Sequence, residues 1–544
     1  MRALGLLLAL AISGAQAADP AKILRVTFQA AETGFDPAKV SDYYSGTVIE
    51  AIFDPLLTYD YLARPATLVP NTAVALPRIT DGGRTYTLQV RRGIYFAEDA
   101  AFKGARRELT ALDYAYSLRR FLDPRNRSPY AFLFEGIAGI ETPDRQTIVI
   151  RLKRTDFNFA HVLAFPLAGA VAREAIEHYG DESAAHPVGS GPFRLKRYVR
   201  SSKIVLEANP GFREVTREGE RLPKIGGVEV SIMEETQSRW LAFQRGESDM
   251  EYQLSEVASA FITEDGKLRP EFAARGIQLD RSVDPEIIYL YFNMQDKTVG
   301  GLAKEKIALR RAIAMSYSVD DQIRIIRKGQ AVRAQYPIPP GVAGHDPDYR
   351  SAIPHDPRAA NALLDRFGYR RGADGFRRMP GGEPLVIRYS SMPTERDRQF
   401  DELMKRALDS IGVRLEIHKD RFPELLKLEN QCRLMVKHSA WIADYPDGDN
   451  FMQLLYGPNS GQSNNACYKS AEYDKRYERS RLLPQGPARD RLYHEMARLM
   501  ETDTVWLLTD SRYRNVLLQP RVQGFHKHPV MHQEWLYIDL ELPR

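Results

Sequence analysis

A tryptophan and an aspartate that follow a short strand are the residues of this sequence best suited to binding a charged ligand. Trp441 and Asp444 come at the end of a short predicted strand that begins at Leu434, and Pro446-Asp447-Gly448 then predicts a turn, because proline fixes φ and glycine accepts positive φ. Open α/β sheets bind ligands at the carboxyl ends of their strands. A carboxylate and an indole at such a place predict a ligand pocket.

A short helix should follow this turn. Asp449 or Asn450 has the side chain of a helix cap, and Phe451, Leu454 and Leu455 recur at the spacing of an apolar helix face. An aspartate and a tryptophan beside a Pro-Gly turn are also typical of proteins that bind nothing there. The pocket is therefore one of two interpretations of the local pattern.

Patterns of known catalytic classes are incomplete in this chain. Ser190 lies between two glycines, but the stretch 186–193 does not match G-x-S-x-G, and its two glycines and two prolines predict a fixed backbone path. His494 and Glu495 begin like H-E-x-x-H, but the second histidine is missing. We predict no catalytic residue and no cofactor.

Three histidines near the end of the sequence, His526, His528 and His532, could ligate a soft or borderline metal together with Met531. Histidines spaced in this way are also typical of an exposed loop. We predict no resident metal and keep the transport of a metal complex as an alternative.

The first 17 residues have the pattern of a secretory leader. Arg2 precedes an apolar run from Ala3 to Ile12, and Ala15-Gln16-Ala17 is a cleavage signal. The run is too short for a resident membrane helix, and no cysteine near the cleavage site could carry a lipid anchor. The sequence therefore predicts a soluble protein exported to the periplasm.

Removal of the leader leaves 527 residues, more than one hydrophobic core usually supports, so two or three domains are expected. Without Arg2 the chain has 75 basic against 71 acidic residues, a net charge of +4. Such a balance indicates neither nucleic acid nor a membrane surface as partner.

Several motifs occur in the order of one family. The stretch around Asp444 resembles W-x-A-D-Y-x-x-x-x-x-F, the signature of family 5 of the bacterial extracellular solute-binding proteins, which are the peptide-binding components of ABC importers. Further motifs similar to that family are Phe35-Asp36-Pro37, Phe53 to Tyr59, Thr110 to Leu118, the stretch 186–193, and Leu309 to Asp320.

The resemblance implies a periplasmic-binding-protein-like α/β fold. Two α/β lobes would be joined by two hinge crossings, and an extra module would be inserted in lobe I. The expected limits are 1–17 for the signal peptide, 18–45, 186–286 and 513–544 for lobe I, 46–185 for its inserted module, and 287–512 for lobe II. Trp535 to Leu540 should close lobe I as a strand.

The resemblance also implies a ligand site. In peptide-binding members the acidic residue of the signature holds the ligand's α-ammonium group, a role that Asp444 would inherit, with Trp441, Ala443 and Tyr445 beside it. The backbone before the Phe-Asp-Pro turn pairs with an extended ligand in that family. It makes candidates of three consecutive residues, Ala31, Glu32 and Thr33.

The implied function is a monomeric periplasmic receptor that binds a peptide or small amine-bearing solute and delivers it to an inner-membrane ABC permease. Family members also take nickel complexes or haem, which is the first alternative. A periplasmic hydrolase is the alternative from a different class.

The two cysteines, Cys432 and Cys467, lie on either side of the Asp444 stretch. An even number of cysteines in an exported chain favours a disulfide, which would clamp this stretch. Two buried thiols are the other possibility.

Overall fold

The computed structural model describes residues 18–542 except 64–65, 253, 264 and 484. The predicted leader lies outside the described residues. Within the described ranges, no helix has both the length and the apolar character needed to cross a membrane.

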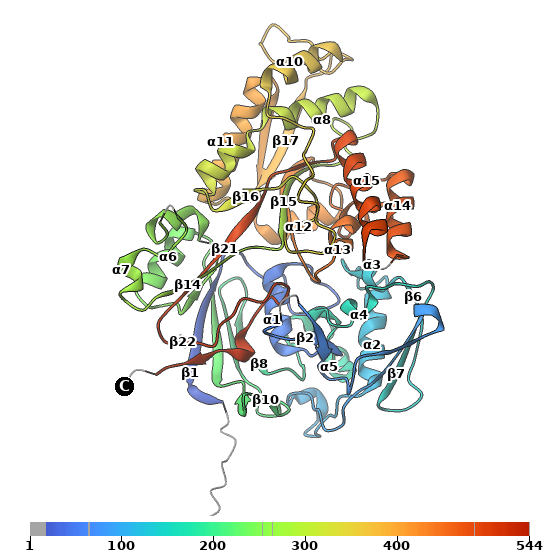
Figure 1. Ribbon diagram of the computed structural model, residues 1–544, viewed down its shortest axis with the longest axis vertical. Helices are drawn as coiled ribbons and strands as arrows, with labels where there is room; N and C mark the ends of the chain where they lie inside the picture. The colour runs from blue at the N-terminus through green and yellow to red at the C-terminus, as the bar shows by residue number, and fades with distance from the viewer. Residues whose placement is uncertain (1–17, 64–65, 253, 264, 484, 543–544) are drawn as a thin grey trace, which may run out of the picture.

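A large mixed sheet organises the first lobe, in the lower half of Figure 1. Its central strand begins at Asp19 and alternates buried apolar side chains, Leu24, Val26 and Phe28. In spatial order the strands are β14 (Gln278–Val283), β21 (Asp510–Leu518), β13 (Met250–Glu251), β1 (Asp19–Phe28), β12 (Ile225–Ile232), β9 (Lys203–Ala208) and β8 (Phe193–Val199), with β16 (Ala331–Arg333) paired to β21. Helices α1 (Tyr43–Ile52), α6 (Thr236–Gln244) and α7 (Pro270–Ala273) belong to this part of the chain.

A second mixed sheet organises the other lobe. Its order is β18 (Arg414–Lys419), β17 (Val386–Ser391), β19 (Val436–Ile442), β15 (Glu286–Phe292) and β20 (Trp506–Leu508). β17 is parallel to both β18 and β19, as the strand-helix alternation of the sequence predicts. The helices of this part are α8 (Lys304–Ser316), α9 (Val319–Asp321), α10 (Pro357–Arg366), α11 (Glu395–Ser410), α12 (Phe422–Asn430), α13 (Asp449–Met452), α14 (Ala471–Arg481) and α15 (Pro487–Asp503).

Two direct crossings join the two large sheets, through Asp284 and Pro285 from β14 to β15 and through Thr509 from β20 to β21. β16 pairs only with the start of β21, beside the second crossing. Charged side chains pair at both crossings: Arg512 with Glu286 at 2.5 Å, and Arg514 with Asp284. The expected fold of two α/β lobes joined by two crossings is confirmed.

A four-stranded antiparallel sheet packs beside the first lobe. Its strands are β4 (Arg78–Thr80), β5 (Thr85–Gln89), β7 (Thr147–Leu152) and β6 (Ile137–Glu141), and its helices are α2 (Ala111–Leu122), α3 (Ala131–Phe134), α4 (Phe159–Val162) and α5 (Arg173–Tyr179). We call this part the side module. The predicted limit at 45/46 falls inside α1, which leads from the first lobe towards the side module.

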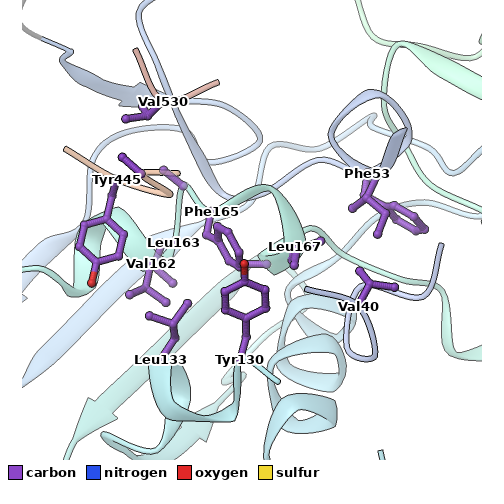
Figure 2. Close-up of a cluster of buried hydrophobic side chains, with 14 of the residues drawn as sticks. Val40, Phe53, Tyr130, Leu133, Val162, Leu163, Phe165, Leu167, Tyr445 and Val530 are labelled. Atoms are coloured by element: carbon purple, nitrogen blue, oxygen red, sulfur yellow. The ribbon is translucent and has the colours of Figure 1, made fainter. Parts of the chain in front are cut away.

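The apolar core does not stop at the lobe boundary. One buried cluster contains Leu133 and Val162 of the side module together with Tyr445 and Tyr456 of the second lobe. Figure 1 shows α14 close to α3, and Figure 2 shows Tyr445 among side-module residues. A separate cluster fills the space between the second sheet and α8, α10 and α11.

The last part of the chain differs from the expectation. Trp535–Tyr537 is a 3₁₀ turn, and only Asp539–Leu540 is a strand (β23), paired with β22 (Val522–Gln523) and not with the large sheet. The backbone N–H of Trp535 donates to Gln533 Oε1 at 2.6 Å. This side-chain bond favours a turn where the apolar pattern alone predicted a strand.

Cys432 and Cys467 form a disulfide, with their Cα atoms 6.1 Å apart. Cys432 lies between α12 and β19, and Cys467 precedes α14. The disulfide therefore ties together the two ends of the segment that contains Trp441 and Asp444.

We expect the Cys432→Ser, Cys467→Ser double variant to lose about 3–4 kcal/mol of unfolding free energy, because the bridge closes a loop of 35 residues in the unfolded chain. Urea titration of oxidised wild type, reduced wild type and the variant measures the loss. Two alkylatable thiols in the unreduced, denatured wild type would contradict the bridge.

Candidate ligand-binding site between the two lobes

A cavity of about 290 Å³ lies between the two large sheets. This volume is just below the range of roughly 300–1,000 Å³ usual for small-molecule sites. The first lobe and side module contribute Gln29, Ala30, Tyr43, Tyr44, Gly46, Tyr130, Phe165 and Leu167 among others. The second lobe contributes the ends of β17 and β19, the first turn of α11, and Asp444.

Asp444 lies two residues beyond the end of β19, and only 4% of its surface is exposed. Its Oδ2 accepts from Asn450 Nδ2 at 2.9 Å. Its Oδ1 accepts from the hydroxyl of Tyr130 at 3.4 Å, a contact that reaches across from the side module. Figure 2 shows Tyr130 beside Phe165 in the apolar wall. The carboxylate is thus held from both lobes.

Asn450 joins the two residues that the sequence singled out. Its Oδ1 accepts from the backbone N–H of Asp444 at 2.9 Å and from Trp441 Nε1 at 3.1 Å. The expected role of Asp449 or Asn450 as a helix cap is wrong, because Gly448 occupies the cap position and no side chain bonds there. Asn450 instead fixes the positions of Trp441 and Asp444 relative to each other.

Burial decides the ionisation of Asp444. Loss of hydration raises the pKa of this carboxyl to about 7, and hydrogen bonds from Asn450, Tyr130 and Trp441 only partly offset that rise. None of the ion pairs among the described residues includes Asp444. A carboxylate buried without a cation is costly, so the site is suited to a ligand that brings a positive charge.

The lysine and arginine residues of the cavity are paired with carboxylates of the protein. Arg327 pairs with Asp510 at 2.9 Å, Lys437 with Glu429 at 3.2 Å, and Arg396 with Asp397 at 3.3 Å. Both members of each pair belong to the protein, so these charges already have a partner without a ligand. Asp42 also lines the cavity without an ion pair among the described residues, and it accepts from the N–H of Ser45 and the hydroxyl of Thr33. We expect Asp444 to attract the ligand cation because it lies beside the indole of Trp441.

A pH dependence follows from the raised pKa of Asp444. Affinity for a free-amine dipeptide should rise about tenfold per pH unit below pH 7 and level off above it, because only the carboxylate attracts the ammonium. The nearby Tyr59 and Tyr130 stay neutral throughout, since burial raises the pKa of each further. Calorimetric titrations between pH 5.5 and 7.5 measure the slope, and Asp444→Asn should flatten it.

The stability of the ligand-free protein should fall with rising pH, whereas the affinity for the ligand rises. The folded pKa of Asp444 lies above its ordinary value of 3.8, so the stability that this group contributes is complete below about pH 4 and is lost as the pH rises through about 7. Urea midpoints of wild type and Asp444→Asn across this range isolate the contribution. Equal pH profiles for the two proteins would contradict it.

Two of the predicted site residues line the cavity, Trp441 and Asp444, and two of their neighbours do not. Ala443 is fully buried and its N–H donates to the carbonyl of Pro285 at 2.8 Å. The hydroxyl of Tyr445 donates to Asp449 at 2.7 Å, and its ring stacks on His161 of the side module. Ala443 and Tyr445 therefore stabilise the turn through contacts outside the cavity.

Ala31, Glu32 and Thr33 are not among the lining residues; Gln29 and Ala30 take their place. Glu32 accepts from the hydroxyl of Tyr198 at 2.7 Å and from the N–H of Ser201 at 2.9 Å. The N–H of Thr33 donates to Ser45 Oγ at 2.9 Å. These contacts point Glu32 and Thr33 towards the first lobe. The two residues that follow β1, Gln29 and Ala30, line the cavity instead.

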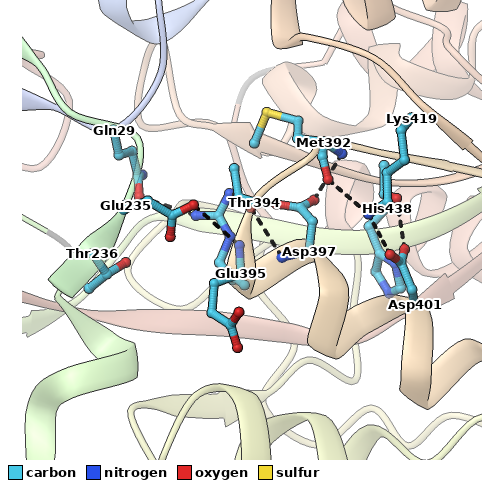
Figure 3. A network of polar contacts seen from close by, with 12 residues as sticks. Gln29, Glu235, Thr236, Met392, Thr394, Glu395, Asp397, Asp401, Lys419 and His438 are labelled. Atoms are coloured by element: carbon cyan, nitrogen blue, oxygen red, sulfur yellow. Dashed lines mark hydrogen bonds and ion pairs between the residues drawn. The ribbon is translucent and has the colours of Figure 1, made fainter. Parts of the chain in front are cut away.

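The start of α11 is a part of the cavity that the sequence did not predict. Thr394 caps this helix by accepting from the N–H of Asp397, and Arg396 projects to Gln29 of the first lobe, with Nη1 and Oε1 3.2 Å apart. Figure 3 shows Thr394, Asp397 and Gln29 in this network. A Thr-x-x-Asp cap after a strand was visible in the sequence, but its contact across the lobes was not.

The three histidines near the end of the chain do not gather around a metal. His528 Nδ1 accepts from the N–H groups of Val530 and Met531 at 3.2 and 3.1 Å, and His532 packs on Tyr43. In the described ranges, no group of three or more histidine, cysteine or acidic residues is arranged to hold a metal ion.

Two mixed sheets, two crossings and a cavity enclosed between them define a two-lobe solute-binding protein. The family model described as bacterial extracellular solute-binding proteins, family 5 Middle, matches residues 67–463. The chain belongs to this family.

Relatives and solved structures agree with this assignment. The chain is 27% identical over 568 residues to "Di/tripeptide-binding protein 2" of Pseudomonas aeruginosa (strain UCBPP-PA14), with 98% of each chain covered. It is 23% identical to the glutathione-binding protein GsiB of Salmonella choleraesuis (strain SC-B67), with 92% of each covered. The periplasmic binding protein DppA from Helicobacter pylori, solved with the peptide STSA, has a TM-score of 0.83, 22% identity, and coverage of 96% of this chain and 98% of that chain.

Proposed function

We propose that the protein is the periplasmic receptor of an ABC import system and binds a short peptide with a free amino terminus. The observation that supports this most directly is Asp444, a carboxylate 4% exposed, in a cavity between two lobes, without a cationic partner among the described residues. The names of the relatives, which refer to di- and tripeptides and to glutathione, point to the same ligand class.

The ligand's α-ammonium group would pair with Asp444, and the ring of Trp441 would face it, a contact worth roughly 0.5–2 kcal/mol. The ends of β1 and β19 offer backbone groups to an extended peptide. Arg396 also lines the cavity, where it pairs with Asp397 and donates to Gln29, and a ligand carboxylate would share this guanidinium group with them. A short peptide carries both charges.

The mechanism we propose is a shift between open and closed states, in which no bond is made or broken. Tyr130 meets Asp444, and Arg396 meets Gln29, so residues of both lobes surround the cavity in the closed form. A ligand that contacts both lobes favours that form. The closed, loaded monomer would then be delivered to the permease.

Calorimetry against a panel of di- and tripeptides, their N-acetylated forms, nickel-histidine and haem tests the proposal. Binding of free-amine peptides, with at least tenfold weaker binding of acetylated ones, is the expected result. Tight binding of nickel-histidine or haem, without peptide binding, would favour the metal-complex alternative. Mass spectrometry of the same samples detects cleaved peptides, which only a hydrolase would produce.

A further inference from the structure

A second, smaller chamber adjoins the ligand cavity at Asp444. Its volume is about 60 Å³, and it lies between the side module, α1 and the C-terminal segment. Asp444 is the residue that lines both spaces. Two of its three carboxylates, Asp444 and Glu50, take part in none of the described ion pairs. We call this space the Glu50 chamber.

The two spaces follow one another along α1. Gly46 lines the ligand cavity and Glu50 lines the chamber; residues four apart share one helix face, about 6 Å apart along the axis. The segment after α4 alternates, with Phe165 facing the cavity and Pro166 the chamber. Figure 2 shows Tyr130, Phe165 and Leu167 of the cavity wall near Phe53 of the chamber.

Glu50 is in an unusual position for an acidic residue. It is in the last turn of α1, where the helix dipole disfavours a negative charge. One oxygen, Oε2, accepts from the N–H groups of His532 and Gln533 at 2.8 and 3.1 Å. Burial, followed by the nearby negative charge of Glu534, raises the pKa of Glu50 to about 8.

The third carboxylate of the chamber is already satisfied. Asp54 pairs with Arg213 at 2.6 Å and accepts from Ser190 Oγ at 2.9 Å. With Arg213 and Asp54 cancelling each other, Glu50 and Asp444 leave the chamber with two acidic groups and no further Lys or Arg among its lining residues.

The remaining walls combine apolar side chains with the polar groups of Thr58, Asn71 and Gln533. The apolar part is formed by Phe53, Pro55, Pro166, Val530 and Leu536 among others. A volume of about 60 Å³ accommodates about four to six water-sized groups, comparable to the methylenes and ammonium of a lysine side chain. Such a side chain packs its methylenes on apolar walls and needs an acid only at its tip.

We propose that the Glu50 chamber is the subsite for a basic side chain, so that the preferred ligand is a peptide with lysine at its amino-terminal position. This inference rests on the proposed peptide-binding function. The α-ammonium group pairs with Asp444, the side chain enters the chamber beside it, and its ammonium pairs with Glu50.

The test compares Lys-Ala with norleucine-Ala, which has the same methylene chain without the amine, and uses Ala-Ala as the reference. At pH 7.5 wild type should bind Lys-Ala at least tenfold more tightly than norleucine-Ala. The preference should fall below threefold in Glu50→Gln, which retains an oxygen to accept from His532 and Gln533. The exposed Glu98→Gln is the matched control and should keep the full preference.

A second readout is the number of protons released. The pKa of Glu50, raised to about 8, means that an arriving ammonium expels a proton, so Lys-Ala should release more protons than norleucine-Ala. Calorimetry in two buffers of different ionisation enthalpy measures this in wild type without any substitution. Equal affinity and equal proton release for the two ligands would overturn the subsite alone, whereas no binding of any of the three dipeptides would overturn the proposed function as well.

Discussion

Replacement of Asp444 by asparagine lowers the affinity for a free-amine dipeptide by about 30-fold or more. The variant leaves a buried ammonium without its counter-charge, which typically costs about 2–5 kcal/mol. Asparagine has nearly the same shape; its oxygen can still accept from Asn450 Nδ2, and its NH2 group can donate to the Tyr130 hydroxyl, so the turn should stay intact. Calorimetric titration of both proteins at pH 7.5 measures the loss.

This prediction has two matched controls, one a ligand and the other a variant. An N-acetylated dipeptide lacks the charge, so it should bind wild type weakly and lose little more in Asp444→Asn. The exposed Asp348→Asn should bind as wild type does. Unchanged affinity of Asp444→Asn for the free-amine ligand would mean that Asp444 only shapes the turn.

Replacement of Gly189 by alanine should destabilise the protein by about 3 kcal/mol or more. An added Cβ would lie 2.0 Å from the backbone oxygen of Ile52, the last residue of α1, and backbone cannot move aside as a side chain can. The neighbouring Gly191 donates its N–H to the same oxygen at 2.8 Å, which fixes the close approach. Urea unfolding measures the change.

The control is Gly139→Ala. Gly139 lies in β6, where an added Cβ meets nothing within 4 Å, so its unfolding midpoint should change little. Wild-type stability of Gly189→Ala would show that α1 can shift away from this segment. A shift of that kind would also move Gly46 and Glu50, so ligand affinity serves as a second measurement.

The sequence predicted the parts of the site that are local. Trp441 and Asp444 are separated by a strand end and a turn, and both are patterns that neighbouring residues determine. The stretch 186–193 was predicted to be structural, and Ser190 does donate to Asp54. Two lobes with two crossings were predictable because the motifs of the family follow its order along the whole chain.

The features of the site that the sequence did not predict depend on contacts between distant segments. Glu32 turns away from the cavity because Tyr198 and Ser201, more than 160 residues later, donate to it. Asn450 has the side chain of a cap, and only the folded turn shows that it holds Trp441 and Asp444. Arg396 reaches the first lobe, and Glu50 meets the C-terminal segment, through pairings that no local pattern encodes.

The apolar core shared by the side module and the second lobe has a thermal consequence. In the proposed mechanism, separation of the lobes exposes side chains such as Val162 and Tyr445 to water. Hydration of apolar surface raises the heat capacity, so closure should lower it, and the preference for the closed form should weaken on cooling. A receptor with this boundary should open more readily in the cold, even with the same ligand and the same ion pairs.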